Sequence, residues 1–304
     1  MKIKTMKKIF ALTILASAVI PGLGLTAHAQ QFALKAYDNL GLGNPMSVTH
    51  SQPDQQHKSS YNTFGVDFGY TFWRKGANSL EANIGFGYAA AGTTFTLPDM
   101  DYHYSAPAAA DEDGNPYERY YELVGMKQTA SVGYFTLPIY LEYQYRCLSW
   151  MGVKAEAGVS LGFRLTSGMG KVSGKATAWG VYPEYDDLLI DEDYLNDFGE
   201  RFIRNATVVD NIAHPFNASL MVGAGFEFYA YEPVSFELGV RYNYGFTQVF
   251  NGGKTVKSGE AYTADTAPVI YTVAGGTQVR PLSDYTSKSK LNPLSLHMGV
   301  TVRF

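Results

Sequence analysis

The stretch that decides the fold is Asn292-Pro-Leu-Ser-Leu-His-Met-Gly-Val-Thr-Val-Arg-Phe304, at the end of the sequence. Side chains alternate between the two faces of a β-strand. One face of this stretch is therefore apolar and carries Leu294, Leu296, Met298, Val300, Val302 and Phe304. The other face is polar or small and carries Ser295, His297, Gly299, Thr301 and Arg303. One side suits hydrocarbon and the other a polar interior, which indicates a strand that spans a membrane.

Seven further stretches alternate in the same way, at residues 32–37, 63–72, 80–89, 129–145, 153–164, 216–228 and 234–244. Short turns at 74–78, 146–151 and 231–233 alternate with long connections at about 38–60, 98–125, 166–215 and 247–290. The pattern predicts an all-β fold, an eight-stranded antiparallel transmembrane β-barrel with short periplasmic turns and long extracellular loops. Lipid requires closure, because an open edge would leave backbone groups unpaired in hydrocarbon. A ten-stranded variant stays open if 171–181 or 269–273 enters the wall, and the longest loops are expected to extend as hairpins.

The N-terminal residues predict export. Lys2, Lys4, Lys7 and Lys8 precede an apolar stretch at 9–20, and Ala27-His28-Ala29 offers a small-residue cleavage site. We therefore expect a signal peptide at 1–29 and a single outer-membrane barrel domain at 30–304. The apolar stretch is too short for a transmembrane helix.

Composition excludes several classes of protein. The net charge is −4, and removal of the four signal lysines makes it −8, which argues against a nucleic-acid partner. The only cysteine, Cys147, excludes an internal disulfide framework and a cysteine-based zinc site. Charged residues are only 17% of the chain, below the usual quarter, as expected of a wall that faces lipid.

A soluble β-sandwich or lipocalin-like barrel is the main alternative fold. Such a protein would place Lys, Glu and Thr on the face opposite its core, whereas here glycine alternates with single charges, as in a narrow lumen. Aromatic residues also gather near the turns, as at Trp73 and Trp150, and near the loop ends, as at Phe64 and Phe163. Two such girdles indicate a membrane protein.

The stretch Tyr134-Phe-Thr-Leu-Pro-Ile-Tyr-Leu-Glu-Tyr143 and the terminal Val302-Arg303-Phe304 resemble small outer-membrane β-barrels of the Bacteroidetes type, the porin-like and PorT-like families, and more broadly OmpA-like and OmpX-like barrels. The resemblance implies the fold, a cell-outer-membrane location and recognition of Phe304 by the outer-membrane assembly machinery. It transfers no catalytic residue. Proline cannot donate to a ladder, so Pro138 should lie at a bulge or a locally lost bond and point inward.

The expected inward faces carry eleven charges, which are Lys35, Asp67, Glu81, Glu142, Lys154, Glu156, Arg164, Glu227, Glu237, Arg241 and Arg303. An eight-stranded barrel is just wide enough for side chains to fill. We therefore expect an ion-pair network that plugs the lumen, with Glu142 and Lys154 close together across the turn at 146–151. The alternative is a narrow pathway for ions or small solutes.

Ser295 and His297 share the inward face of the last strand. Barrel enzymes that act on lipid carry a serine and a histidine on the lipid-facing wall, and no acidic partner is evident here. We therefore predict no catalytic residue and no enzyme, with a lipid-modifying barrel enzyme as the third hypothesis.

The long connections are acidic and rich in tyrosine, which is a composition of recognition surfaces. The residues of this candidate interaction surface are Asp99, Asp101, Tyr120, Tyr121, Tyr185, Asp186, Asp187, Asp191 and Asp193. The acidic runs at 111–115 and 191–193 offer oxygen ligands for Ca²⁺, but they lack EF-hand spacing. Asp99, Asp101 and His103 are a second candidate metal site, because they would share a face if that segment is a strand. We predict no metal and no cofactor.

Two functional hypotheses follow. The first is a barrel with a plugged lumen and a structural or surface-interaction role, which meets an extracellular ligand or protein partner through its acidic loops. The second is a narrow passive channel.

Overall fold

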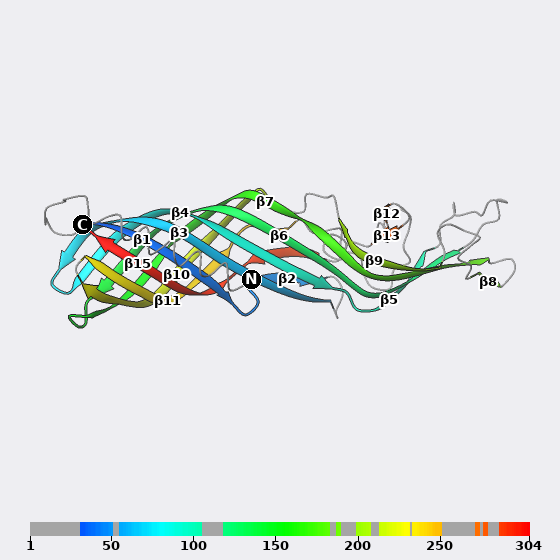
Figure 1. The fold of residues 1–304 in the computed structure, drawn as a ribbon, viewed down its shortest axis with the longest axis horizontal. Coiled ribbons are helices and arrows are strands. Elements are labelled where there is room, and N and C mark those ends of the chain that lie inside the picture. Colours follow the sequence, from blue (N-terminus) through cyan, green and yellow to red (C-terminus); the bar gives the residue numbers. More distant parts are fainter. Residues whose placement is uncertain are drawn as a thin grey trace.

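The computed structural model describes residues 31–50, 55–104, 118–182, 187–189, 199–207, 213–231, 233–250, 271–273, 276–278 and 286–304 (Figure 1). Its eight long strands are β1 (Phe32–Leu42), β3 (Gln56–Lys75), β4 (Asn78–Thr96), β6 (Glu118–Tyr145), β7 (Met151–Tyr182), β10 (Phe216–Tyr231), β11 (Val234–Gly245) and β15 (Leu294–Arg303). No helix within the described ranges is long and apolar enough to cross a membrane. The expected signal peptide, at 1–29, lies outside the described residues.

The eight long strands form a closed antiparallel ring. Their order is β6-β4-β3-β1-β15-β11-β10-β7, and pairing of β6 with β7 closes the circle. The terminal strand β15 pairs with β1 on one side and with β11 on the other, so that Val302 lies opposite both Leu34 and Val234. Every ring strand has two partners, so the wall has no edge. The eight-stranded barrel predicted from the sequence is confirmed.

Apolar side chains of the wall point outward. Ile139 and Leu238 are 42% and 43% exposed, whereas the alternating Glu142 on β6 is 1% exposed. An outer surface of this kind is costly in water and favourable in lipid.

Three tight turns lie at one end of the barrel, which we call the turn end. Gly76 joins β3 to β4 with a φ of 59°, a backbone conformation that favours glycine. Residues 146–150 join β6 to β7, and β10 ends three residues before β11 begins. The C-terminal Phe304 lies at the same end, where its backbone N–H and C=O bond to Phe32 (Figure 1).

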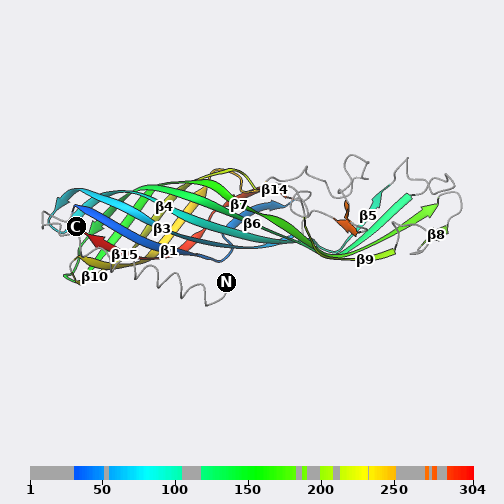
Figure 2. The ribbon, with the colours of Figure 1, turned by 45° about the horizontal axis from the view of Figure 1, so that its top comes forward.

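At the opposite end, β6 and β7 continue far beyond the ring. They contain 28 and 32 residues and stay paired as far as Glu118 opposite Val181. Three short strands, β5 (Met100–Tyr104), β8 (Asp187–Leu189) and β9 (Gly199–Thr207), add to their edges. We call β5, β8, β9 and the paired stretches 118–124 and 175–182 the extension, a narrow twisted sheet that leaves the barrel (Figure 2).

The predicted strand bounds were too short on this side. Parts of the expected connections 98–125 and 166–215 are β-structure, because strand pairing continues where the apolar alternation has ended. The ten-stranded variant is wrong, since 171–181 is the outer part of β7. The other candidate for an added wall strand was 269–273. Its described residues form β12 (Tyr271–Val273), which pairs with β13 (Gly276–Gln278) and not with the ring. Two further strands, β2 (Met46–His50) and β14 (Thr286–Leu291), pair with each other.

Pro138 interrupts the ladder as expected. It is buried and faces the lumen. The pairing of β6 with β4 passes from Ile139 opposite Ile84 to Thr136 opposite Gly87, with no pairing between, while the register is unchanged. The missing N–H of proline is therefore accommodated by a locally lost bond and not by a bulge.

Candidate functional site

A chain of buried ion pairs crosses the lumen. Lys35 Nζ on β1 lies 2.6 Å from Glu81 Oε1 on β4 and 3.0 Å from Glu142 Oε1 on β6. Lys154 Nζ on β7 lies 3.4 Å from Glu142 Oε2 and also contacts Glu237 on β11. The hairpin turn after β6 thus brings Glu142 and Lys154 together. Carboxylates and ammonium groups alternate along this chain, which offsets the cost of removing each charge from water.

Two arginine–carboxylate pairs flank this chain. Arg241 on β11 holds Glu156 on β7 in a bidentate contact, with Nε to Oε1 at 2.6 Å and Nη2 to Oε2 at 2.9 Å. Arg303 on β15 contacts both oxygens of Glu227, with Nη2 to Oε2 at 3.1 Å. Planar forks of this kind are the strongest geometry for a charge-assisted hydrogen bond.

Neutral polar side chains complete the network. His297 Nδ1 lies 2.7 Å from Asn39 Oδ1, and its Nε2 lies 3.3 Å from Glu237 Oε2. The hydroxyl of Tyr140 donates to Asp67 Oδ2 at 2.7 Å. Gln144, Ser235 and Thr301 donate to Glu227 or Glu237. Of these polar partners, Asn39 was not singled out from the sequence, because it falls in the expected connection 38–60, whereas β1 continues to Leu42.

Glycines on the inward faces provide the room for these large side chains. A Cβ at Gly69 would overlap the Glu81 carboxylate, and a Cβ at Gly223 would overlap that of Glu156. Gly158 lies opposite Tyr140, whose backbone and Cβ fill the space where its side chain would be. Alternation of glycine with single charges therefore reflects steric packing in a narrow lumen.

Arg164 lies elsewhere in the barrel. It is eight residues beyond Glu156 on β7, about 26 Å along the strand, and its guanidinium donates to the backbone carbonyl of Ala213. It therefore lies toward the extension. In the described lumen the buried charged side chains are then six carboxylates and four bases, together with His297. Hydroxyl and amide donors supply the hydrogen bonds that a fifth base would have made.

A layer of buried apolar side chains lies between the ion pairs and the extension. Phe95, Val249 and Phe250 are at most 1% exposed. The rest of this apolar layer is Met46, Ala89, Ala91, Ala130, Val132, Tyr134, Ala213 and Leu291. Ser289 fixes the loop that carries Phe250, because its hydroxyl accepts from Phe250 N at 2.9 Å and its carbonyl accepts from Val249 N at 2.9 Å. A cavity of about 20 Å³ beside Tyr134 and Asn217 has room for about one water molecule.

The inward pair on β15 does not form a nucleophile–base contact among the described hydrogen bonds. Ser295 is fully buried, and no partner is described for its hydroxyl. His297 bonds instead to Asn39 and Glu237. Glu237 is an acidic neighbour that the sequence did not reveal. Both side chains face the lumen and not the lipid, which is the wrong face for an enzyme acting within the bilayer.

The candidate interaction surface is only partly within the described residues. Asp99 precedes β5, and its Oδ1 accepts from Gly125 N at 2.9 Å. The backbones of Asp101, Tyr120, Tyr121 and Asp187 belong to strands of the extension, and Asp101 lies opposite Glu122. Tyr185, Asp186, Asp191 and Asp193 lie outside the described residues, as does the acidic run 111–115. No group of three metal-ligating side chains occurs among the residues that were described.

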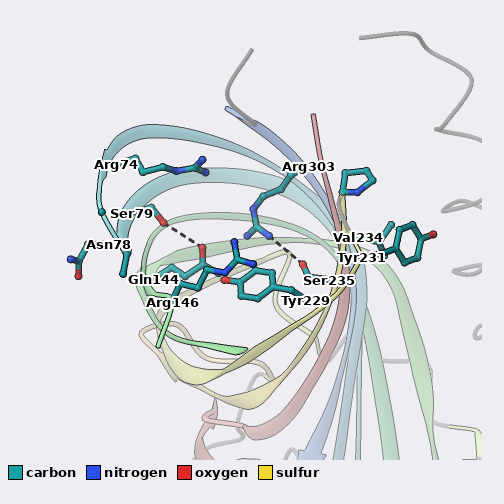
Figure 3. Close-up of a pocket in the computed structure, with 13 residues that line it drawn as sticks. Arg74, Asn78, Ser79, Gln144, Arg146, Tyr229, Tyr231, Val234, Ser235 and Arg303 are labelled. Carbon is teal, nitrogen blue, oxygen red and sulfur yellow. Dashed lines mark hydrogen bonds between the residues drawn. The ribbon is translucent and has the colours of Figure 1, made fainter. Parts of the chain in front are cut away.

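A cavity of about 190 Å³ opens at the turn end of the lumen (Figure 3). Arg74 from β3, Arg146 from the β6–β7 turn and Arg303 from β15 extend into it from three sides. Arg146 lies over the ring of Tyr229, with Cζ 4.2 Å from the ring centroid, and its Nη2 donates to Ser149 O at 2.6 Å. The described residues that line this cavity include three arginines.

The chain matches a protein-family model described as an outer membrane protein β-barrel domain, over residues 28–251. No curated protein matches it. Similar solved structures include Neisserial surface protein A, at 13% identity over 92% of this chain and 100% of that chain, with a TM-score of 0.31. Ail of Yersinia pestis, crystallised with a heparin analogue, has 9% identity over 90% and 97% of the two chains and a TM-score of 0.25. The translocator domain of the autotransporter NalP of Neisseria meningitidis has 14% identity over 99% and 97%, also at 0.25.

Proposed function

The chain belongs to the family of outer membrane protein β-barrel domains, and from this premise we propose that it is a non-conducting barrel that presents the extension at the cell surface. The proposal is supported by two layers of buried side chains. One layer consists of paired charges around Glu142 and Lys154, and the other is the apolar layer around Phe95 and Phe250. A hydrated ion would have to displace both.

Single-channel recording in planar bilayers tests the proposal. The wild-type protein is expected to give no steady open state. Glu142→Gln with Lys154→Met removes one link of the ionic layer, and Phe95→Ser with Phe250→Ser opens the apolar layer. Each pair alone should leave the other layer in place, so steady conductance is expected only when all four changes are combined.

Lys127→Gln, an exposed position on β6, serves as the control and should behave as wild type. A stable open state of the wild-type barrel would contradict the proposal and favour the alternative, a narrow passive channel for small solutes or ions.

The extension supports a surface-interaction role. It is built by strand pairing alone beyond the lipid-facing wall, and the sequence around it is acidic and rich in tyrosine. Replacing 99–124 and 174–205 each by an Asn-Gly turn should remove it and leave the ring intact. Leu97 N bonds to Met126 O at 2.9 Å and Val172 pairs with Ala206, so both junctions already bring the chain ends together.

Binding of a decalysine peptide to the protein in lipid nanodiscs tests the charge of this surface. The full-length barrel should bind the peptide and the shortened one should lose most of that binding, with more salt weakening it further. Equal binding by both proteins would place the interaction elsewhere on the barrel.

A further inference from the structure

We propose that three lysines, Lys58, Lys288 and Lys290, bind the phosphate groups of lipid headgroups at the outer edge of the barrel wall. We call these three residues the lysine rim. They lie at the end of the barrel that faces the extension. The site goes beyond the proposed function, since it needs neither a plugged lumen nor binding by the extension.

The first argument is the position of the strand pair that carries two of the lysines. β2 begins four residues after β1 ends, and β14 ends three residues before β15 begins. Asn292 N donates to Pro45 O at 2.7 Å where the β1–β15 pairing passes into the β2–β14 pairing. The β2–β14 pair therefore lies directly beyond Leu42 and Leu294, which are paired and are 44% and 46% exposed (Figure 2). Its lysines are next to the lipid-facing surface.

The second argument is the direction of the side chains on β14. Ser289 and Leu291 are buried, whereas Lys288 is exposed and Lys290 is partly exposed. The two lysines therefore belong to the outer face of the strand pair. Lys290 Nζ lies 5.9 Å from the ring centroid of Tyr244, an aromatic residue of the outer wall that is 45% exposed. A lysine that reaches an interfacial aromatic ring places its ammonium group at the level of lipid headgroups.

The third lysine comes from β3, on the other side of β2. Met46 N donates to Ser59 Oγ at 2.9 Å, and Ser59 N donates to Asn44 Oδ1 at 2.8 Å, so this part of β3 lies beside the start of β2. Lys58 precedes Ser59 and is exposed, and it shares the outer face of β3 with Phe64. The charge of Lys58 therefore joins that of the two lysines on β14 at one edge of the wall.

Charge and position together select the class of ligand. Lysine binds phosphate as a point charge, and basic side chains beside an anionic membrane surface attract its lipids. Lys58 and Lys288 are exposed, and neither forms an ion pair with a residue that the structure describes. A phosphate that is attached to acyl chains can reach these lysines while its chains pack against Leu42 and Leu294. A soluble phosphate lacks this second contact, so the position favours a lipid.

Native mass spectrometry of the full-length protein in maltoside micelles tests the site, with diphosphorylated lipid A as the probe. Wild type is expected to retain the lipid. Lys58→Gln with Lys288→Gln should weaken binding at least tenfold, and it leaves the contact of Lys290 with Tyr244 in place. Changing the same two lysines to arginine keeps the charge and should keep binding.

Lys127→Gln with Lys171→Gln is the matched control. It removes the same charge from exposed positions on β6 and β7, and it should bind the lipid as wild type does. Heat-modifiable migration on gels confirms that each variant is folded. Absence of binding by wild type, or equal loss in the rim variant and the control, would overturn the site.

Two further probes test the chemistry of the ligand. Lipid A without its phosphate groups should bind wild type no better than it binds the rim variant. Equal retention of the phosphorylated and the dephosphorylated lipid would show that acyl chains alone are recognised, and the proposal would fail. Glucosamine 1-phosphate, a soluble fragment of the headgroup, should not displace lipid A at equal concentration. Displacement would make the site one for soluble phosphate and would contradict the lipid assignment.

Discussion

At the scale of single residues, Arg241 and Glu156 form the buried ion pair that can best be tested by itself. Each side chain is only 3% exposed, and the pair shares two hydrogen bonds. The guanidinium also lies over the rings of Tyr37 and Tyr140, at 5.2 and 5.4 Å from their centroids. Removal of one partner would leave the other as an unpaired charge in a site closed to water.

We therefore expect Arg241→Met to lower the free energy of unfolding by about 3–5 kcal/mol. Glu156→Gln combined with Arg241→Met should recover most of that loss, because no isolated charge then remains. Urea unfolding in lipid vesicles, followed by tryptophan fluorescence, measures both. Equal destabilisation by the single and the double change would show that packing of Arg241 on the two rings, and not its charge, dominates.

Gly225 and Gly92 give a second comparison at this scale. A Cβ at Gly225 would lie 2.6 Å from Leu238 O and 2.7 Å from Gly239 Cα, which are backbone atoms that cannot move aside. At Gly92 the nearest atoms are Ser60 Oγ at 3.3 Å and Ala130 O at 3.9 Å. Gly225→Ala should cost about 1–3 kcal/mol, whereas Gly92→Ala should be neutral. The same urea titration checks this, and similar values for both would contradict the steric argument.

The inward charges could be predicted from the sequence because strand parity assigns a face to each residue. Glu142 and Lys154 could also be predicted as neighbours, since a single short turn separates them. The alternation of faces does not show how far along the barrel axis a residue lies. Arg164 has the same parity as Lys154, yet it lies ten residues further along β7 and contacts Ala213. The contact of His297 with Glu237 joins residues 60 apart in sequence, and only the register of β11 against β15 reveals it.

At the scale of elements, the strands were predicted well only where lipid imposes a rule. Inside the membrane the two faces of β6 and β7 meet hydrocarbon and lumen, so apolar residues alternate with polar ones. The extension lies beyond the lipid-facing wall, where no lipid imposes that alternation. Backbone pairing persists there without an alternating pattern in the sequence, and this explains why 118–125 and 166–182 fall within the expected long connections.

The terminal strand β15 joins β1 to β11 in the ring, and the residue that follows it, Phe304, allows a test of assembly. Phe304 is partly exposed, and its backbone pairs with Phe32 through two bonds of 2.9 and 3.1 Å. A change of side chain leaves those bonds intact. Phe304→Ala should therefore refold from urea into detergent as well as wild type.

In cells the same variant should accumulate less folded protein in the outer membrane, because the assembly machinery is expected to read the terminal aromatic ring. Heat-modifiable migration on gels measures the folded fraction in both settings. Equal levels in cells would remove Phe304 as the recognised residue, and a defect in detergent would make its role one of stability.

At the scale of the whole molecule, the two ends of the barrel differ because short and long strand connections lie at opposite ends. Eight strands joined by alternating short and long connections place the tight turns and Phe304 at one end and the extension at the other. Hydrocarbon requires a closed wall in which each strand has two partners, and the number of alternating stretches in the sequence then gives the number of strands. The apolar layer includes residues of the β2–β14 pair and of the loop at 249–250. These segments have no alternating pattern and meet through long-range contacts, so the sequence did not reveal the layer.

This polarity leads to a prediction about topology. Cys147 is the only cysteine of the chain and lies exposed in the turn between β6 and β7, so it should face the periplasm. A maleimide carried on a polymer too large to cross the outer membrane should leave Cys147 unmodified in intact cells and modify it after the membrane is permeabilised. In a Cys147→Ser background, Lys127→Cys on the exposed outer side of β6 near the extension should react in intact cells. Both thiols belong to the same strand hairpin, so their opposite accessibility can arise only if the membrane lies between them. Labelling of Cys147 in intact cells would invert the barrel and place the arginine-lined mouth outside the cell.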